Sequence, residues 1–587
     1  MPDDARSDLE QALRELRAAV AETPLPLALP SAEHADGIAA GVRAQLDDYL
    51  LPRLAHPDAP LLAAVGGPTG AGKSTLVNSL IRAPASAAGV LRPTTRAPVL
   101  VCHPTDATWF RGTTLLGRFT RTSSPTADPG RLHLVTAPAL DAGCAFLDTP
   151  DIDSVVGQSR AVSHQLLAAA DLWLFMVTAA RYADAVPWQL LHTARERGTV
   201  VALVLGRVRD HATAEVVDHI REMLAANGLA DTPLFVVPET RVDDYGLLPE
   251  TALTPLRDWL DALAADAAAR AALVRQTLDG AVAALSPSVE VLASAVEEQV
   301  AVAEVLAEHV GMAYGAARSA AERGIRDGAL LRGEVMARWQ EFVATDEWLR
   351  TPLAAAGRLR DRLAAAVTRS SGAGRPLAAA VESRLVALVR SVTVDAAEQT
   401  YRAWHAHVGA EPLLAGETGA DLSAPRPAPA AGARGEDPVA SMVAHWRDDT
   451  LDLVRSETTT EAARPAYATE ATAALVLMAV AAPPVPPAVT TDEDRQVLAA
   501  VLEDEVVRKL AAKARDDLLD RISVLLDGEA ARYLDRLAGS SLDTSVARRL
   551  RERAAALERV RAAAFSDAMA STPAAEQTRA DAEEDGQ

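Results

Sequence analysis

The residues best suited to chemistry form a glycine-rich run that begins at Gly67. The run reads GPTGAGKS, follows the apolar stretch LLAAV and precedes TLVNSLI, which has the pattern of a helix. Glycines at this spacing let backbone N–H groups surround phosphate oxygens, and the N-terminus of the following helix favours negative charge. The run therefore predicts a phosphate-binding loop. Its predicted nucleotide contacts are Gly67, Pro68, Thr69, Gly70, Ala71, Gly72, Lys73, Ser74 and Thr75.

Two side chains of this loop have separate predicted roles. The lysine of such a loop reaches the outer phosphates, and the hydroxyl that follows it binds Mg²⁺. We therefore predict Lys73 and Ser74 as catalytic residues, with Ser74 also a metal ligand. A glycine-rich turn that matches by chance is the alternative, and the flanking strand and helix patterns disfavour it.

A carboxylate ends a second apolar run, CAFLDTPD, 75 residues after Lys73. A carboxylate at the end of a buried strand can hold the magnesium shell and begin a loop that senses the terminal phosphate. A solvated acidic turn is the alternative for so short a motif. The position along the chain favours the first interpretation, so we predict Asp148 as a metal ligand and Asp148 and Asp151 as nucleotide contacts.

Between these runs lies LRPTTRAPVLV, in which Thr94 or Thr95 offers a second hydroxyl to Mg²⁺. Its placement favours Thr95, which completes a predicted metal set with Ser74 and Asp148. Arg96 beside it is predicted as catalytic, and Arg181 in TAARYAD is a further candidate arginine finger, supplied in cis or across a dimer. Surface ion pairing is the alternative for both arginines.

Recognition of the base is expected after a later apolar run, VALVLGRVRDHA. A guanine-binding chain carries [NT]-K-x-D there; this one has Gly206 followed by Arg207, and Asp210 falls one place late. We predict Arg207 and Asp210 as nucleotide contacts, with the Asp210 carboxylate accepting hydrogen bonds from guanine N1 and N2. Because these residues do not match the guanine-binding motif, adenine remains an alternative base.

These motifs together resemble the GTPase domain of the dynamin family, in particular bacterial dynamin-like proteins. GPTGAGKSTLVNSL resembles the family's phosphate loop and helix, TRAP its first switch, and DTPD occupies the place of the second switch's D-x-P-G. The resemblance implies a GTPase that uses Mg²⁺ with GTP, followed by a helical neck and stalk. Motifs cover only part of the chain, and architecture alone matches the rest.

Three residues depart from that family pattern. Asp151 replaces a glycine whose N–H would meet the γ-phosphate, and Ile152 cannot orient a water molecule as a glutamine does. Gly70 stands where dynamins carry serine and potassium-dependent GTPases asparagine. Catalysis would therefore need another group or a partner, and a switch with weak hydrolysis is a competing hypothesis.

The elements that position these residues follow from apolar periodicity. Seven short apolar runs alternate with helix-length segments between residues 59 and 266, which is typical of βαβ units. We predict an α/β P-loop NTPase domain with a mostly parallel, doubly wound sheet. The seven predicted strands are LLAAVGG, PVLVCH, RLHLVTA, CAFLD, DLWLFMVTA, TVVALVLG and PLFVVPET.

The rest of the chain predicts a large all-α bundle or stalk. Leu278, Val282 and Leu285 begin an apolar pattern that continues to Val310. Within it, Ser286–Pro287 predicts either a helix restart, with Ser286 as N-cap and Pro287 at the first position, or a kink. Aromatic residues Trp339, Phe342 and Trp348 are expected in the helical core. The predicted segments are 1–58, N-terminal helices that pack with the helical part; 267–410, bundle; 411–438, disordered linker; 439–568, C-terminal helices; and 569–587, disordered acidic tail.

Composition narrows the partners and the location. The 587 residues carry a net charge of −22, which disfavours nucleic acid as a partner. Two cysteines, Cys102 and Cys144, make no disulfide framework, and the acidic N-terminus lacks a signal-peptide pattern, so we expect a cytoplasmic protein. The apolar stretch at 471–489 is expected to be a buried helix stopped by prolines, with peripheral membrane contact as the alternative.

Three functions remain open at this point. The first is a mechanochemical GTPase whose helical stalk moves with the nucleotide state, as the resemblance implies. It would form a homo-oligomer, or pair with a paralogue, through its nucleotide and helical domains. The others are a nucleotide-gated switch or scaffold with weak hydrolysis, and a P-loop ATPase of another class.

Overall fold

The computed structural model describes residues 1–86, 97–112, 114–151, 157–209, 213–344, 374–415, 437–460, 469–482, 505–540 and 542–566. The chain divides into two compact units. Unit 1 comprises Met1–Thr23, Ser31–Glu297 and Asp543–Gln587, and unit 2 comprises Pro24–Pro30 and Glu298–Leu542. All strands of the described chain lie in unit 1, whereas the described part of unit 2 is helical.

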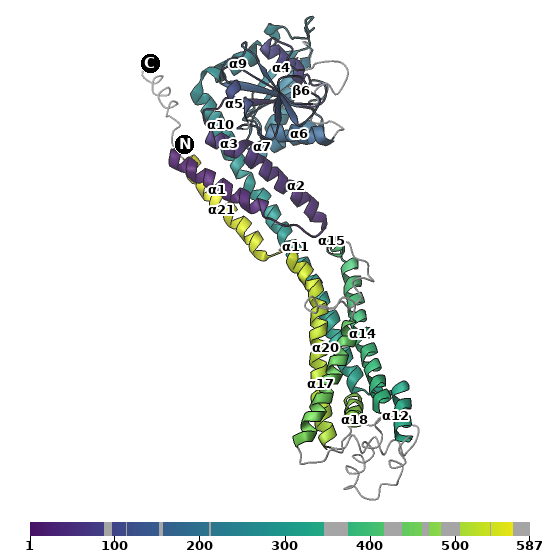
Figure 1. Ribbon diagram of the computed structural model, residues 1–587. Helices are drawn as coiled ribbons and strands as arrows, with labels where there is room; N and C mark the ends of the chain where they lie inside the picture. Colours follow the sequence, from purple (N-terminus) through teal and green to yellow (C-terminus); the bar gives the residue numbers. More distant parts are fainter. Residues whose placement is uncertain are drawn as a thin grey trace, which may run out of the picture. The chain divides into compact units, whose positions relative to one another are not determined.

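Unit 1 is built on an eight-stranded sheet with the order β3-β4-β2-β5-β1-β6-β7-β8 (Figure 1). All neighbouring strands pair in parallel except β2 and β5, so the predicted mostly parallel α/β fold is confirmed. The strands are β1 Leu61–Gly66, β2 Val99–Cys102, β3 Thr120–Thr122, β4 Arg131–Thr136, β5 Cys144–Asp148, β6 Leu172–Thr178, β7 Val200–Val208 and β8 Leu234–Pro238.

Helices cover both faces of this sheet, which explains why its central strands are buried along their whole length. Every residue of β1, β5 and β6 is buried. In Figure 1, α4 and α9 lie on one side of the sheet and α6 and α7 on the other. The helices and helical turns from α4 to α9 are α4 Lys73–Ile81, α5 Ala107–Arg111, α6 Gly157–Ala168, α7 Ala185–Glu196, α8 Thr213–Ala226, η3 Glu250–Ala252 and α9 Thr254–Ala265.

The sequence missed one strand. Seven apolar runs predicted β1, β2 and β4–β8, but the three residues of β3 read TRT and contain no apolar side chain. This strand lies at the edge of the sheet, where one face or side can remain in water. Its pairing with β4 therefore left no periodic signal in the sequence.

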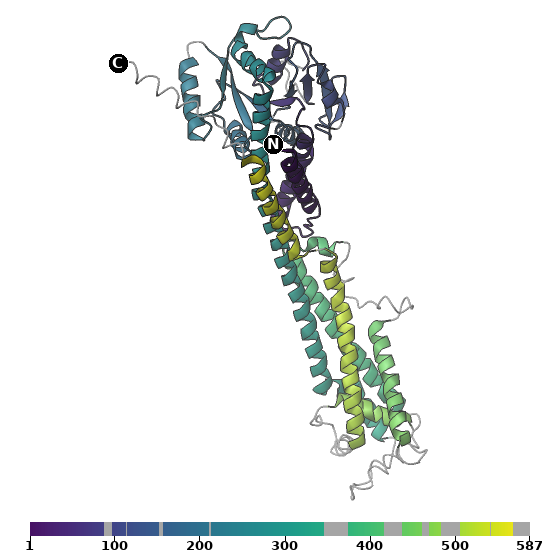
Figure 2. The same cartoon turned by 90° about the vertical axis from the view of Figure 1, so that its left-hand side faces the viewer.

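The helices that flank the sheet domain in sequence pack together within unit 1. Helix α1 lies beside α21 in Figures 1 and 2, and Arg553 of α21 forms an ion pair with Glu15 of α1 at 2.6 Å. Arg551 of the same helix reaches Glu290 at 2.7 Å. These flanking elements are α1 Asp3–Ala21, α2 Pro30–Gln45, a π-helical turn η1 Leu46–Leu50, α3 Leu51–Ala55, α10 Ala267–Ala283, the start of α11 Leu285–Arg326, and α21 Thr544–Phe565.

A buried ion pair joins these helices to the sheet. The Arg53 guanidinium of α3 and the Asp171 carboxylate before β6 are only 2% and 1% exposed and contact each other directly. Asp171 also accepts hydrogen bonds from Tyr49 Oη at 3.1 Å and from the Leu62 backbone at 2.7 Å, and Thr277 Oγ1 donates to its carbonyl at 2.9 Å. Burial disfavours the Arg53 charge, but the adjacent carboxylate outweighs it and raises the pKa of the guanidinium.

Unit 2 is a bundle with one continuous hydrophobic core. Helices α11 and α20 lie side by side in Figures 1 and 2 and are joined by an ion pair between Arg318 and Asp527. Trp339 is buried in this core as predicted, whereas the side chains of Phe342 and Trp348 lie outside the described residues. Besides α11, its elements are η4 Ala329–Leu331, α12 Glu334–Ala344, α14 Gly374–Ala406, α15 Glu411–Leu414, α17 Pro438–Thr460, α18 Thr469–Ala481 and α20 Glu505–Gly539.

The apolar pattern predicted from Leu278 to Val310 is confirmed, but the cap predicted for its helix restart is wrong. The predicted residues are buried, and the helix breaks at Ala284, between α10 and α11. Ser286 is therefore not the N-cap, because both Ser286 and Pro287 lie inside the first turn of α11. Proline is tolerated there because its missing N–H would have had no partner within the helix.

Two apolar helical stretches bear on membrane contact. Among the described residues, one stretch, 267–326, is long and apolar enough to cross a membrane, and 44% of its most apolar window is buried. The second is α18, whose residues Ala474–Ala482 are all buried in the core of unit 2. The buried-helix interpretation of this stretch therefore agrees with its described part, and residues 483–489 lie outside the described chain.

We predict that Asp171→Ala will destabilise unit 1 by about 3–5 kcal/mol, because it leaves the Arg53 charge buried without a counter-ion. Urea denaturation followed by tryptophan fluorescence measures this. The matched control is Asp128→Ala, which breaks an exposed pair with Arg131 and should cost no more than about 1 kcal/mol. Equal losses for the two variants would show that the Asp171 pair does not hold the helices to the sheet.

Candidate functional site

The predicted phosphate loop connects β1 to α4 in a conformation that needs glycine. Gly67 has φ 147°, and a Cβ placed there would lie 2.2 Å from the carbonyl oxygen of Met176 in β6. Gly72, at φ 104°, is the residue before α4, and a Cβ there would lie 3.1 Å from the Met176 side chain. The loop therefore packs against the neighbouring strand and begins a helix whose first N–H groups are available to an anion.

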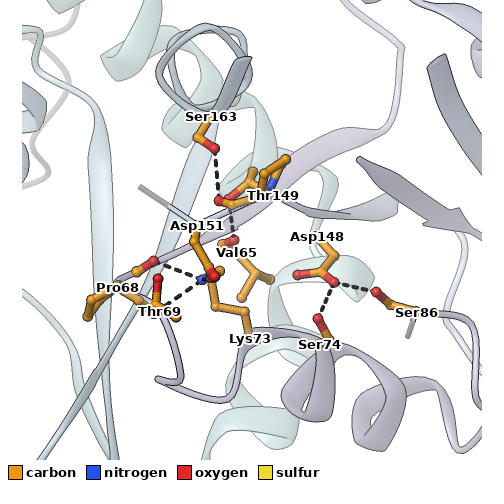
Figure 3. A network of polar contacts seen from close by, with 12 residues as sticks. Val65, Pro68, Thr69, Lys73, Ser74, Ser86, Asp148, Thr149, Asp151 and Ser163 are labelled. Atoms are coloured by element: carbon orange, nitrogen blue, oxygen red, sulfur yellow. Dashed lines mark hydrogen bonds and ion pairs between the residues drawn. The ribbon is translucent and has the colours of Figure 1, made fainter. Parts of the chain in front are cut away.

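Lys73 is held inside this loop (Figure 3). Its ammonium group donates to the carbonyl oxygens of Gly67 at 2.9 Å and Pro68 at 3.3 Å, and it forms an ion pair with Asp151 Oδ1 at 2.5 Å. The side chain of Lys73 is only 4% exposed. The chain contains 55 arginines but only two other lysines, Lys509 and Lys513. A slender ammonium therefore occupies a place that a planar guanidinium would not fill in the same way.

Ser74 and Asp148, which the sequence predicts as metal ligands, meet beside Lys73. Ser74 Oγ donates to Asp148 Oδ2 at 2.7 Å, and Ser86 Oγ donates to the same oxygen at 2.5 Å. Burial raises the pKa of Asp148, and the two serine hydrogen bonds and nearby Lys73 oppose that rise. The other carboxylate oxygen, Oδ1, is buried and has no hydrogen-bond partner among the described residues.

This donor set fits Mg²⁺. A buried carboxylate oxygen without a partner is costly, and a hard cation that prefers oxygen ligands would remove that cost. Asp148 Oδ1 and Ser74 Oγ would supply two oxygens, and Mg²⁺ usually completes its shell with water and substrate phosphates. No cluster of three or more His, Cys, Asp or Glu side chains suited to a metal occurs in the described parts of the chain.

The segment after Asp148 is anchored at two further points. Thr149 Oγ1 donates to the Val65 carbonyl at 2.9 Å, and Ser163 Oγ of α6 donates to the Pro150 carbonyl at 2.8 Å (Figure 3). Thr149 and Ser163 are fully buried. These contacts fix the backbone from Asp148 to Asp151 against β1 and α6, and so they set where the Asp151 carboxylate points.

Asn78, Ser86 and Ser163 belong to the site but were not predicted from the sequence. Asn78 of α4 accepts hydrogen bonds from the backbone N–H groups of Ala85 and Ser86 and donates to the Ser86 carbonyl at 2.7 Å. Ser86 is thereby held where its hydroxyl reaches Asp148. A buried asparagine in the middle of an apolar helix was the one available signal, because such an amide must find partners.

Several predicted residues lie outside the described chain. These are Thr94, Thr95 and Arg96 of the predicted first switch, Ile152 after Asp151, and Asp210 after β7. Their predicted roles therefore remain predictions. Gly70, Ala71 and Thr75 lie within the described loop and the start of α4, as the sequence placed them.

The remaining candidate arginines differ in their relation to the loop. Arg181, after β6, donates to the Thr69 carbonyl at 3.4 Å and pairs with Asp184 at 2.7 Å, so it lies beside the phosphate loop. Arg207 is exposed and has φ 59°, at an irregularity in the pairing of β7 with β8. A positive φ is uncommon for a residue with a side chain and often marks a functional loop.

The cysteines and His103 have structural surroundings. Cys102 and Cys144 are free, buried thiols in neighbouring strands β2 and β5, and burial raises their pKa values to about 11 and about 12. They therefore stay as protonated, unreactive thiols near neutral pH. His103 Nδ1 contacts Thr105 Oγ1 at 2.7 Å in the loop after β2.

Comparison with known proteins adds only a distant likeness. No protein-family model matches the chain, and no curated protein matches it significantly. Two solved structures, both described as an oligomerised bacterial dynamin pair that provides a mechanism for long-range sensing and tethering of membranes, align with most of the chain. The first covers 97% of this chain and 96% of its own at 11% identity and a TM-score of 0.41; the second covers 90% and 92% at 11% identity and a TM-score of 0.38.

These matches are to bacterial dynamins, the family that the motifs resemble. With TM-scores below 0.5, they support no conclusion about what this chain does. The sheet, the phosphate loop and the buried carboxylate define the class instead: unit 1 has the fold of a P-loop nucleotide-binding domain, and the chain adds a large helical bundle.

We predict that Gly67→Ala will cost of order 2 kcal/mol in stability and will weaken nucleotide-analogue binding about tenfold or more, because the new methyl group meets a backbone oxygen at 2.2 Å. Thermal melting and fluorescence titration measure the two effects. Gly37→Ala, in α2 with open space around it, is the control and should be neutral or slightly stabilising. Unchanged binding in Gly67→Ala would contradict the conformational role of this glycine.

Proposed function

We propose that this chain is a Mg²⁺-dependent nucleoside triphosphatase of the dynamin-like type that hydrolyses GTP. One observation carries the proposal. Lys73, Ser74 and Asp148 converge where β1 and β5 end and α4 begins, and Asp148 Oδ1 has no hydrogen-bond partner in the part of the chain that the structure describes. Ligands of open α/β sheets bind at the carboxyl ends of the strands, and these residue types there suit phosphate and Mg²⁺.

Each residue of the site has a defined part in this proposal. Backbone N–H groups between Gly67 and Thr75, except at Pro68, hold the phosphates, and the Lys73 ammonium binds the outer ones. Mg²⁺, held by Ser74, Asp148 and Thr95, would neutralise charge on the phosphates. Arg96 and Arg181 are the candidate cations for charge that develops during phosphoryl transfer. Arg181 already contacts the loop at the Thr69 carbonyl.

The preference for guanine rests on the family resemblance. Arg207 and Asp210 are the proposed base contacts, and neither matches the usual lysine-containing motif. The open alternative is a P-loop ATPase. Measuring the binding of GTP and of ATP side by side distinguishes a GTPase from an ATPase.

Coupling to the helical unit is the second part of the proposal. A mechanochemical enzyme would transmit the nucleotide state to the helical bundle, pair through its nucleotide and helical domains, and meet a membrane through residues 471–489. Ala474–Ala482 are buried in the bundle core, so membrane contact through this segment requires α18 to leave its neighbours. The proposed location is the cytoplasm, with association at a membrane surface.

One observation favours a second function, a nucleotide-gated switch with weak hydrolysis. The Lys73 ammonium is engaged by Asp151 in addition to two loop carbonyls. A lysine so engaged must change partners before it can bind a terminal phosphate. Slow turnover would follow if that exchange were unfavourable.

We predict that Lys73→Ala will lower the affinity for a fluorescent GTP analogue with Mg²⁺ by more than about tenfold and abolish phosphate release, because the loop loses its only side-chain cation for phosphate. Lys509→Ala, an exposed lysine of α20, is the matched control and should behave as wild type.

Both assays are run with GTP and ATP, with and without liposomes. GTP preference with turnover raised by liposomes supports the dynamin-like enzyme. Binding without turnover in either condition supports the switch, and ATP preference supports an ATPase. Equal behaviour of the Lys73 and Lys509 variants would overturn nucleotide binding at this loop.

We predict that Arg181→Ala will lower the maximal turnover rate about tenfold or more while changing the affinity for the GTP analogue little, as expected for a group that acts on transition-state charge. Steady-state phosphate release and equilibrium titration measure these separately. Arg195→Ala in α7 is the control. A fall in affinity without a fall in turnover would assign Arg181 to loop structure only.

A further inference from the structure

The Lys73 ammonium group has no donor to spare. A lysine ammonium carries three N–H donors, and the structure provides three acceptors: the carbonyls of Gly67 and Pro68 and the carboxylate of Asp151. The two carbonyls belong to the loop itself. Asp151 is therefore the partner that an incoming phosphate oxygen must replace.

The pair between Lys73 and Asp151 is strong enough for this exchange to matter. The two side chains are 4% and 13% exposed, and their charged atoms lie 2.5 Å apart. Separating a buried pair is costly unless another charge takes the place of the lost partner. A phosphate can compensate Lys73, but Asp151 would then face the same phosphate as a like charge.

Asp151 cannot easily move away while its neighbours stay in place. Thr149 is hydrogen-bonded to β1, and the Pro150 carbonyl accepts from Ser163 of α6. The backbone just before Asp151 is thus fixed on two sides. Relief of the repulsion must come from rotation of the Asp151 side chain or from rupture of these buried hydrogen bonds.

Nucleoside diphosphates and triphosphates should differ in how strongly the Asp151 carboxylate repels them. The lysine of a phosphate-binding loop, here Lys73, contacts the β- and γ-phosphates. A diphosphate takes one donor position and brings no third phosphate, whereas a triphosphate adds a further anion where Asp151 pairs with Lys73. The conflict is therefore larger for the triphosphate.

We propose that Asp151 is a specificity-determining residue that lowers the affinity for nucleoside triphosphate relative to diphosphate, by competing with the terminal phosphate for Lys73. This inference rests on the proposed nucleotide binding at the loop. It assigns to Asp151 a competing role in place of the contact with nucleotide that its position in the sequence suggested.

The test is the ratio of affinities for a non-hydrolysable GTP analogue and for GDP, each with Mg²⁺, in the full-length chain. Asp151→Asn keeps the shape and removes the charge, and Asp151→Gly removes the side chain. For both variants we expect the ratio to shift about tenfold or more toward the triphosphate, a change of about 1.4 kcal/mol in relative binding.

Asp128→Asn is the matched control, because it removes one negative charge from an exposed ion pair in the same unit and should leave the ratio unchanged. A thermal melt of each variant checks folding. An unchanged ratio in both Asp151 variants, or an equal gain for GDP and the triphosphate analogue, overturns the inference while leaving nucleotide binding intact. Failure of wild type and variants to bind either nucleotide overturns the proposed function and this inference with it.

Discussion

The buried contact between Arg53 and Asp171 is the constraint on which the architecture of unit 1 depends. Asp171 stands at the turn that leads into β6, and its two oxygens are shared among the Arg53 guanidinium, the Tyr49 hydroxyl and the Leu62 backbone of β1. Arg53 in turn donates to the carbonyls of Ala59 and Pro60 just before β1. Two charges in a dry interior are tolerated because nearly every donor and acceptor is used. These contacts thereby hold the flanking helices in a fixed position against the central strands.

The position of the phosphate loop follows from the pairing of β1 with its neighbouring strands. Strand β1 pairs with β5 on one side and β6 on the other, so the loop that leaves β1 has Met176 of β6 as one wall and the end of β5 as the other. Gly67 and Gly72 let the backbone pass close to that wall. Asp148 then meets Ser74 across the opposite side, although 74 residues separate them in sequence. The chemistry of the site is thus a consequence of strand order.

Burial has opposite consequences for the two charged residues of the site, Asp148 and Lys73. Lys73 and Asp148 are both nearly free of water, which strengthens any interaction that either makes. Within the described chain, Asp148 Oδ1 has no hydrogen-bond partner and so would favour a cation, whereas Lys73 is already paired with Asp151. In the proposed site, the same low-polarity surroundings would therefore promote metal binding at Asp148 and oppose phosphate binding at Lys73.

The sequence by itself determined the elements whose signals are local. Mainly apolar runs predicted seven of the eight strands, GPTGAGKS predicted the loop between β1 and α4, and the spacing of Leu278, Val282 and Leu285 predicted a buried helix face. Such patterns reflect the burial and backbone geometry of residues that are close together in the sequence, so the local sequence alone is enough to predict them. The polar strand β3 and the helix start near Ser286 escaped because pairing at a sheet edge and a break at Ala284 leave no such pattern.

Only the tertiary structure decided which distant side chains meet. Asn78 holding Ser86, Ser163 holding Pro150, and Arg53 paired with Asp171 join segments whose separation in sequence carries no signal. Asp151 is the clearest case. The sequence showed only that an aspartate replaces a glycine of the family motif. Its pairing with Lys73 exists because β1 and β5 are neighbours, which brings Lys73 Nζ and Asp151 Oδ1 to 2.5 Å although the residues are 78 apart in sequence. Such contacts depend on how the whole sheet packs, because electrostatic energy is set by distance in space.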